Sequence, residues 1–382
     1  MSRARVLPSA RLSRPAVKCR PATLSDFERI HALERRYNLG FRSFEEWSHL
    51  WVDNPACKYA GDLPIGWVLE DSEHEVVGSI GSVPFLFELN GRQLIAAQAA
   101  SWVVEECYRG YAPLLFDQFL SQSGVDLYLC VAGNADAQPV IMSQCSRVPA
   151  GTWNRAAFWI ANYGGFAASA LAKRDVRFRS WLRYLVCAAM VAHDVFRRDA
   201  LRAALRRGKD YEVRTCTAFD GQFDDFWETV RARNPSQLRA TRSREVLEWH
   251  FKYPLARNAA WISTVSDGSQ LLAYAVFSRK DVSTIGLRRV RLIDYQSRDG
   301  EAWLLGPMLA DTLERCKRDG TAVLESIGWR IGNGDLMDKL APHFRTLPSW
   351  WYFYKAATPA LANILKQPAV WDPLLYDGDH CI

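Results

Sequence analysis

The chain has 382 residues, of which 49% are hydrophobic and 12% are Phe, Trp or Tyr. This length predicts two domains, and this much apolar material excludes wholesale disorder. The net charge of +6 is unevenly placed: residues 1–20 hold six basic and no acidic residues, and residues 173–209 hold eleven basic and three acidic ones. The rest of the chain is net negative, so we expect no specific nucleic-acid partner for the folded domains.

Cysteine and histidine usage argues against a metal or disulfide framework. The nine cysteines and seven histidines are scattered, without CxxC or HExxH spacing. We therefore expect no bound metal, free thiols and a cytoplasmic location.

The N-terminal half predicts an alternation of helices and strands after a disordered basic arm at residues 1–17. Asp26-Phe27 marks a first helix, and a Trp-containing stretch that ends in Pro55 marks a second. Strands follow, with Asn90-Gly91 as a hairpin turn between two of them. The expected strands and helices after Pro55 are, in chain order, strands 66–71, 75–89 and 93–104, helix 110–122, strand 126–132 and a short helix from Asn134.

Residues 161–210 predict a basic helical linker. Their uncharged run at 184–193 has ten residues, too few to cross a bilayer. Two interpretations fit this segment. We favour a helix whose apolar face packs on one domain; the alternative is a basic helix at 173–209 that lies on the inner face of a membrane.

The C-terminal half repeats the order of the first half. Four pairs of identical residues share one offset of 199, namely Asp26 and Asp225, Phe27 and Phe226, Glu46 and Glu245, and Pro55 and Pro254. The matching strands and helix are strands 259–265, 271–278 and 287–296, helix 301–320 and strand 321–328. We therefore predict a duplication with one unit at 18–160, a second at 211–358 and a tail at 359–382.

Residues 99–134 carry the most specific motif. A strand ends at 106 and is followed by Tyr108-Arg109-Gly110, a helix, another strand and Asn134. This order resembles the GNAT (GCN5-related N-acetyltransferase-like) superfamily, whose phosphate loop is commonly R/Q-x-x-G-x-G/A and often begins Tyr-Arg-Gly. The sequence departs from that loop at Ala112 and Leu114, and Pro113 removes one amide donor.

The resemblance implies an α/β fold with two tandem GNAT-like domains, each a twisted, mostly antiparallel sheet flanked by helices. It also implies acetyl-CoA or another acyl-CoA as co-substrate, with the pyrophosphate at a helix N-terminus. Transfer to an amine would be direct, with Glu105 as candidate base and Tyr111 as candidate acid. The implied cofactor-binding residues are Val103, Val104, Arg109, Gly110, Tyr111, Ala112 and Asn134.

The second half is expected to lack its own cofactor site. Its corresponding turn, 296–301, has one glycine and two acids, which would repel a pyrophosphate. Asp294, Tyr295 and Glu325 lie at strand ends, where they would line an acceptor pocket or serve as ordinary strand-end polar residues. The tail from Trp371 is similar to the closing segment of tandem GNAT-like proteins encoded with bacterial polysaccharide genes. That likeness implies an amine or amino-sugar acceptor in envelope or exopolysaccharide biosynthesis.

Two other functions fit the sequence. FemAB-like aminoacyl transferases also pair two GNAT-like units, and the basic linker would suit their tRNA donor. The second alternative is a catalytically silent GNAT-like scaffold. The features that support it are Pro113 and the acidic turn at Asp299.

Overall fold

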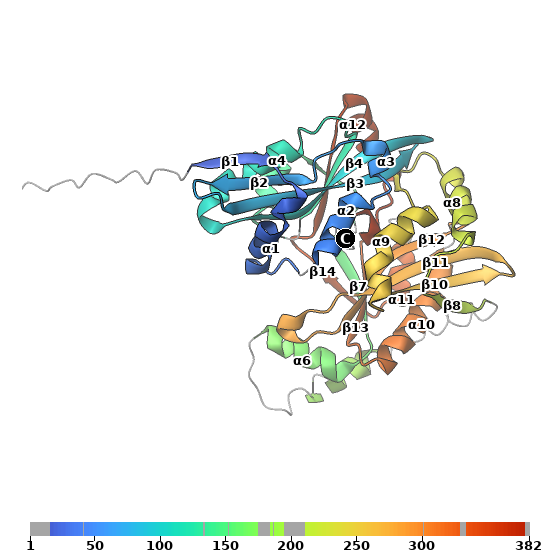
Figure 1. The fold of residues 1–382 in the computed structure, drawn as a ribbon. Helices are drawn as coiled ribbons and strands as arrows, with labels where there is room; N and C mark the ends of the chain where they lie inside the picture. Colours follow the sequence, from blue (N-terminus) through green and yellow to red (C-terminus); the bar gives the residue numbers. More distant parts are fainter. Residues whose placement is uncertain are drawn as a thin grey trace, which may run out of the picture.

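The computed structural model describes residues 16–40, 42–132, 134–151, 153–174, 184–185, 187–194, 211–300, 302–328 and 334–378. Most of the predicted basic arm and most of the 173–209 segment proposed for the membrane contact lie outside these residues. Two mixed sheets flanked by helices make up the fold (Figure 1), which confirms the predicted fold class. In the described part of the chain, no helix has both the length and the apolar character to cross a membrane.

The first sheet carries the strands predicted for the N-terminal half. Its order is β1-β2-β3-β4-β5-β15-β6, and β9 pairs with β3. Neighbouring strands are antiparallel, except for the parallel pair β4 and β5. The strands are β1 (Val17–Pro21), β2 (Gly66–Asp71), β3 (Val76–Leu89), β4 (Arg92–Val104), β5 (Leu127–Ala132), β6 (Ser146–Arg147), β9 (Arg239–Ala240) and β15 (Trp351–Ala356).

The second sheet has the same plan. Its order is β8-β10-β11-β12-β13-β7-β14, and its parallel pair, β12 and β13, corresponds to β4 and β5. The strands are β7 (Arg155–Ile160), β8 (Val213–Cys216), β10 (Ala260–Asp267), β11 (Gln270–Arg279), β12 (Arg289–Ser297), β13 (Val323–Ile327) and β14 (His343–Thr346).

The two halves exchange one strand each. β7 lies in the second sheet between β13 and β14, and β15 lies in the first sheet between β5 and β6. The sequence-based division placed residues 155–160 with the first unit and residues 351–356 with the second, and their hydrogen bonds place each of them in the opposite sheet. Alternating side chains specify a strand but not its partner, so the sequence pattern did not contain this exchange.

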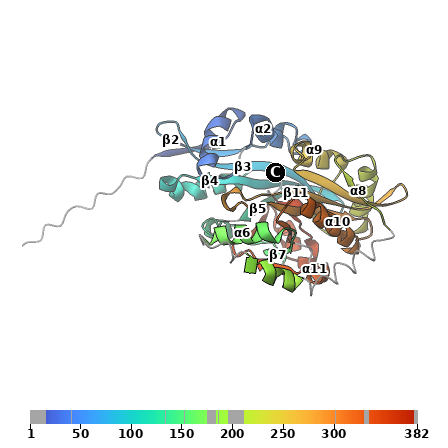
Figure 2. The same ribbon diagram turned by 90° about the horizontal axis from the view of Figure 1, so that it is seen from below.

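Helices cover the sheets in layers. α1 (Phe27–Arg36), α2 (Phe44–Val52), α9 (Arg244–Ala256) and α8 (Gln222–Arg233) form one row over both sheets (Figure 2). The other α-helices with described bounds are α3 (Cys57–Ala60), α4 (Ala112–Phe119), α5 (Gln138–Met142), α6 (Tyr163–Lys173), α10 (Leu305–Arg318), α11 (Gly334–Leu340) and α12 (Pro359–Leu365). Residues 184–185 and 187–194 are also helical.

α2 and α9 join the two halves at the middle of that row. His49 Nε2 lies 3.0 Å from the carbonyl oxygen of Trp249, and Trp249 Nε1 donates back to the carbonyl oxygen of His49 at 3.0 Å. Both side chains are buried. This reciprocal pair and the exchanged strands make the two halves a single packing unit.

We expect neither half to fold alone. If the chain is cut between residues 175 and 183, the N-terminal fragment lacks β15 and the C-terminal fragment lacks β7. Each sheet then loses an inner strand and exposes two new edges. Circular dichroism should show each fragment poorly folded by itself and ordered after mixing. A separate fragment that unfolds cooperatively would contradict this prediction.

Candidate functional site

The centre of the first sheet is interrupted by a β-bulge. The register between β3 and β4 shifts between Ser79 and Gly81, whose partners are Val103 and Ala100. Ser101 lies inside the bulge with φ +48°, a left-handed conformation that is uncommon for residues other than glycine. Such strain is typical of functional sites.

β4 and β5 separate just before this bulge. Their parallel pairing covers only three residue pairs, the last between Gln98 and Leu129. After that, β5 continues along β15, whereas β4 continues along β3 to Val104. The two strands therefore diverge.

The predicted phosphate turn follows β4 directly. Glu106–Tyr111 form a 3₁₀ turn, and α4 begins at Ala112. Pro113 occupies the first turn of α4, where its missing N–H costs no helical hydrogen bond. Arg109 and Gly110 are exposed, and a side chain at Gly110 would meet no atom within 4 Å. The outer face of the turn is therefore open to a ligand.

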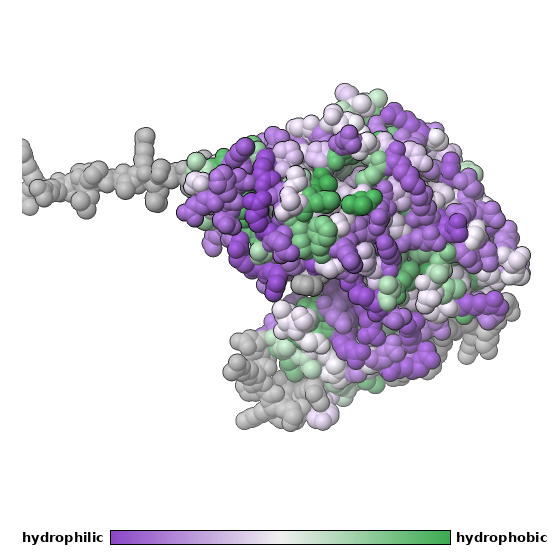
Figure 3. Space-filling view, in the orientation of Figure 1, coloured by the Kyte–Doolittle hydropathy of each residue, from purple (hydrophilic) through white to green (hydrophobic). Residues whose placement is uncertain are grey.

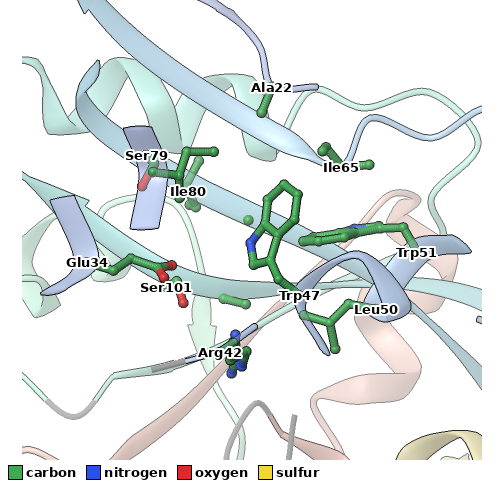
Figure 4. A pocket seen from close by; sticks show the side chains of 13 residues that line it. Ala22, Glu34, Arg42, Trp47, Leu50, Trp51, Ile65, Ser79, Ile80 and Ser101 are labelled. Atoms are coloured by element: carbon green, nitrogen blue, oxygen red, sulfur yellow. The ribbon is translucent and has the colours of Figure 1, made fainter. Parts of the chain in front are cut away.

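A small cavity lies against the bulge, on the side covered by α1 and α2 (Figure 4). Its volume of about 20 Å³ holds one water molecule. Apolar side chains dominate its lining, and Glu34, Arg42, Ser79 and Ser101 are the polar residues that contribute to it. In Figure 4 the carboxylate of Glu34 faces Ser101, with Trp47 across the cavity and Arg42 below.

Glu34 is the chemically distinctive group of this cavity. Its residue is 5% exposed, and burial raises the pKa of its carboxyl, an effect that a hydrogen bond from Ser101 and the charge of Arg42 partly offset. Within the described residues, Glu34 Oε1 and Ser79 Oγ are both buried and have no hydrogen-bond partner. A buried carboxyl with a raised pKa and a free oxygen at a cavity is suited to accept a proton.

The sequence analysis missed Glu34, although a signal was present. Phe27, Ile30 and Leu33 form the buried stripe of α1, and Glu34 lies four positions after Ile30 on the same face. A carboxylate on an apolar helix stripe is unusual, because burying an unpaired charge is costly.

The predicted catalytic residues lie near this region. Glu105 follows β4 and pairs with Arg36 at 2.7 Å, and it accepts a hydrogen bond of 2.8 Å from the Tyr37 hydroxyl. Both partners belong to the end of α1, so Glu105 and Glu34 are held by the same helix region. Tyr111 is half-buried at the last position of the 3₁₀ turn.

The predicted cofactor-binding residues are distributed around the diverging strand. Val103 and Val104 are buried on opposite faces of β4. Asn134 is exposed after β5, and its side chain accepts a hydrogen bond from the Asp136 N–H. The predicted start of a helix at Asn134 is wrong: α5 begins later, and its N-cap is Ala137.

The corresponding part of the second half is filled by the C-terminal tail. The short 3₁₀ helix Leu375–Asp377 packs against β12, and Asp377 is buried. Arg242 donates to both Asp294 and Asp377 at 3.0 to 3.1 Å, and Tyr274 donates to Asp294 at 2.8 Å. A buried ion cluster therefore occupies this region.

The three predicted acceptor residues lie in different environments. Asp294 belongs to the ion cluster just described, and Tyr295 packs in the apolar core with α10. Glu325 is buried among Arg289, Arg291 and Arg345, and the Arg291 Nε–Glu325 Oε2 distance is 2.8 Å. The structure does not gather these side chains around one pocket among those found in the described residues.

Neighbouring side chains form hydrogen bonds around the turn at 296–300 in the second half. Arg233 donates to the carbonyl oxygens of Ser297 and Arg298 and lies 3.0 Å from the position of a side chain at Gly300. Arg298 in turn donates to Leu271 and Thr229. These contacts occupy the guanidinium groups of Arg233 and Arg298.

An apolar patch lies on the surface of the first half at α2. Figure 3 shows an apolar patch where Figure 1 places α2. α2 exposes Phe44 and Val52, and Tyr59 of α3 is also exposed. α2 thus presents apolar groups to solvent on one side and forms the wall of the Glu34 cavity on the other.

Comparison with known proteins bears on the fold. No family model matches the sequence, and no curated protein matches it. Among solved structures, Saccharomyces cerevisiae N-myristoyltransferase with bound myristoyl-CoA is similar at a TM-score of 0.54 and 12% identity, over 91% of this chain and 84% of that one.

Two bacterial structures give the same result. GCN5-related N-acetyltransferases from Kribbella flavida and Anabaena variabilis are similar at TM-scores of 0.51 and 0.50 and identities of 14% and 12%. Each alignment covers 90% of this chain, and 71% and 73% of the respective neighbour. The chain therefore has the fold of the GCN5-related N-acyltransferases.

Proposed function

We propose that the protein is an acyl-CoA-dependent N-acyltransferase with its donor site in the first half. The observation that carries this proposal is the arrangement at Ser101: two central strands diverge at a strained bulge, beside a cavity that holds the buried carboxyl of Glu34. The fold shared with N-acyltransferases supports the same reaction class.

In this proposal the donor lies along the diverging part of β4. Backbone groups near Val103 and Val104 would hold the pantetheine arm. The turn at Arg109 and the start of α4 would hold the pyrophosphate, since exposed N–H groups, the helix dipole and a guanidinium all favour an anion there. The described part of the turn in the second half is less suited to an anion, because the guanidinium groups of Arg233 and Arg298 are already hydrogen-bonded within the protein.

The chemical step would be direct transfer. The amine nitrogen attacks the thioester carbonyl, the C–N bond forms and the C–S bond breaks. Glu34, through a water of the size that fits the cavity, accepts the proton that the amine loses. The CoA thiolate leaves and is protonated, and Tyr111 is the candidate acid. Backbone amides at the bulge would polarise the carbonyl.

The acceptor proposed here is an amine of a small molecule or an amino sugar. The similarity of the tail to proteins encoded with polysaccharide genes supports a role in envelope or exopolysaccharide biosynthesis. A panel of amino sugars and small amines, assayed by release of CoA thiol, identifies the acceptor class.

Arg109→Glu is expected to weaken acyl-CoA binding roughly 10- to 100-fold, because it replaces a charge-assisted contact with repulsion. Arg298→Glu should change binding little, and the exposed Arg318→Glu is the surface control. Isothermal titration calorimetry with acetyl-CoA and longer acyl-CoAs makes the comparison.

Other results would contradict a single donor site at the Arg109 turn. Equal losses at Arg109 and Arg298 would indicate two working donor sites. Unchanged binding in Arg109→Glu would place the donor elsewhere, and a wild-type protein that binds no acyl-CoA would favour the scaffold function.

A further inference from the structure

A cluster of potential metal ligands lies outside the acyl-transfer site, where the helix at residues 187–194 meets the second sheet. His193 and Asp194 are the last two described residues of that helix, and His343 is the first residue of β14. The donor atoms of the three side chains lie within 4.8 Å of one another. His193 is exposed, His343 is half-buried and Asp194 is buried, so the cluster opens to solvent on one side.

The donor atoms of this cluster lie close enough together to be brought onto one small cation. Asp194 Oδ1 is 2.7 Å from His343 Nε2 and 3.2 Å from His193 Nδ1. Ligands of a tetrahedral Zn²⁺ at about 2.0 to 2.1 Å lie about 3.3 Å apart. Side-chain shifts of a few tenths of an ångström would therefore open the cluster enough to admit the ion. The open side leaves room for a water as the fourth ligand.

Surrounding groups already hold the ligands in position. The Tyr163 hydroxyl donates to Asp194 Oδ2 at 2.6 Å, which leaves Oδ1 directed at the imidazoles. Phe158 stacks on the ring of His343 at 5.0 Å, and that ring stacks on His193 at 5.1 Å. Partners of this kind orient ligands and raise metal affinity.

We propose that His193, Asp194 and His343 bind Zn²⁺ or a similar borderline divalent cation, and that the ion fastens the 187–194 helix to β14. Two imidazoles with one carboxylate favour Zn²⁺, Co²⁺, Ni²⁺ or Cu²⁺ over Mg²⁺ and Ca²⁺. The sequence analysis expected no metal because no spacing motif joins residue 194 to residue 343. The fold brings them together, and the site does not depend on acyl transfer.

The test uses the full-length chain after chelator treatment and dialysis. Calorimetry with Zn²⁺ should show one ion per chain, and Co²⁺ should give the visible absorption of a tetrahedral site. Mg²⁺ should not compete. His193→Gln and His343→Gln should each lower the affinity at least ~100-fold, since each removes a ligand from a three-ligand site. Tyr163→Phe should lower it ~10- to 100-fold.

The matched control is His74→Gln. His74 also pairs with a carboxylate, Glu70, at 2.9 Å, but it is exposed and belongs to the first half. This variant should bind Zn²⁺ like the wild type. Since His193 is exposed, its replacement tests the site even if His343→Gln fails to fold. A wild type that binds neither Zn²⁺ nor Co²⁺, or equal binding by the wild type and His193→Gln, would overturn the proposal.

Discussion

Replacing Arg242 by Met is expected to destabilise the fold by about 3 to 5 kcal/mol. The Arg242 side chain is 3% exposed and bridges Asp294 and Asp377, so its loss leaves two carboxylates buried without their cation. The measurement is the free energy of unfolding in urea, followed by circular dichroism and by tryptophan fluorescence.

Two further variants serve as controls for this prediction. Arg244→Met removes an exposed ion pair of 3.2 Å with Asp224 and should cost about 0 to 1 kcal/mol. Adding Asp294→Asn and Asp377→Asn to Arg242→Met should recover part of the loss, because the uncompensated charges are then gone. If the free energy of unfolding of Arg242→Met stayed within 1 kcal/mol of the wild-type value, this ion cluster would not be what holds the C-terminal tail against β12.

The second large effect is expected at Glu34. Glu34→Gln should lower kcat roughly 10²- to 10⁴-fold, the usual contribution of a positioned general base. Acyl-CoA affinity should remain unchanged, because the proposed donor contacts lie on β4 and at the Arg109 turn. Stability should be equal or slightly higher, since the change removes a buried carboxyl that lacks a full set of partners.

Glu105→Gln separates the two candidate bases. If Glu105 is the base, its variant loses kcat and Glu34→Gln does not. Glu28→Gln, an exposed change on the same helix, is the matched control. The kcat of all three variants is measured by release of CoA thiol, and the acceptor is the amine identified in the acceptor panel.

The raised pKa of Glu34 predicts how kcat and stability depend on pH. The base acts only when deprotonated, so kcat should fall with decreasing pH already above the ordinary range of a glutamate. The effect on stability has the opposite sign. A carboxyl whose pKa is higher in the folded than in the unfolded protein favours folding at low pH, and that contribution is lost as the pH rises through its folded pKa. Glu34→Gln should remove both effects.

Local sequence signals were sufficient for several of the helices, strands and turns. Asn90 and Gly91 take φ values of 53° and 73°, as a tight hairpin turn requires, and they connect β3 to β4 as predicted. The Tyr108-Arg109-Gly110 motif marked the turn between β4 and α4 correctly. Such features depend on residues close in sequence, and their geometry is set by backbone sterics.

Only part of the candidate site could be predicted from local sequence signals. β4 and the turn after it follow a motif, so Val103, Val104 and Arg109 could be proposed as donor contacts from the sequence, and they stay predictions. Glu34 could not be assigned a role, since its raised pKa depends on burial beneath α2 and on a bulge in a strand more than sixty residues away. Desolvation is a property of the packed surroundings.

The sequence by itself determined the α/β class, much of the order of elements and the place of the turn between β4 and α4, because these follow from periodicity and turn chemistry. Only the tertiary structure decided that β7 and β15 are exchanged between the sheets. It alone buried Asp294 with Arg242 and Asp377, and it alone brought His343 to Asp194. A side-chain pattern fixes which face of an element is buried, whereas the partner of that face depends on the path of the whole chain.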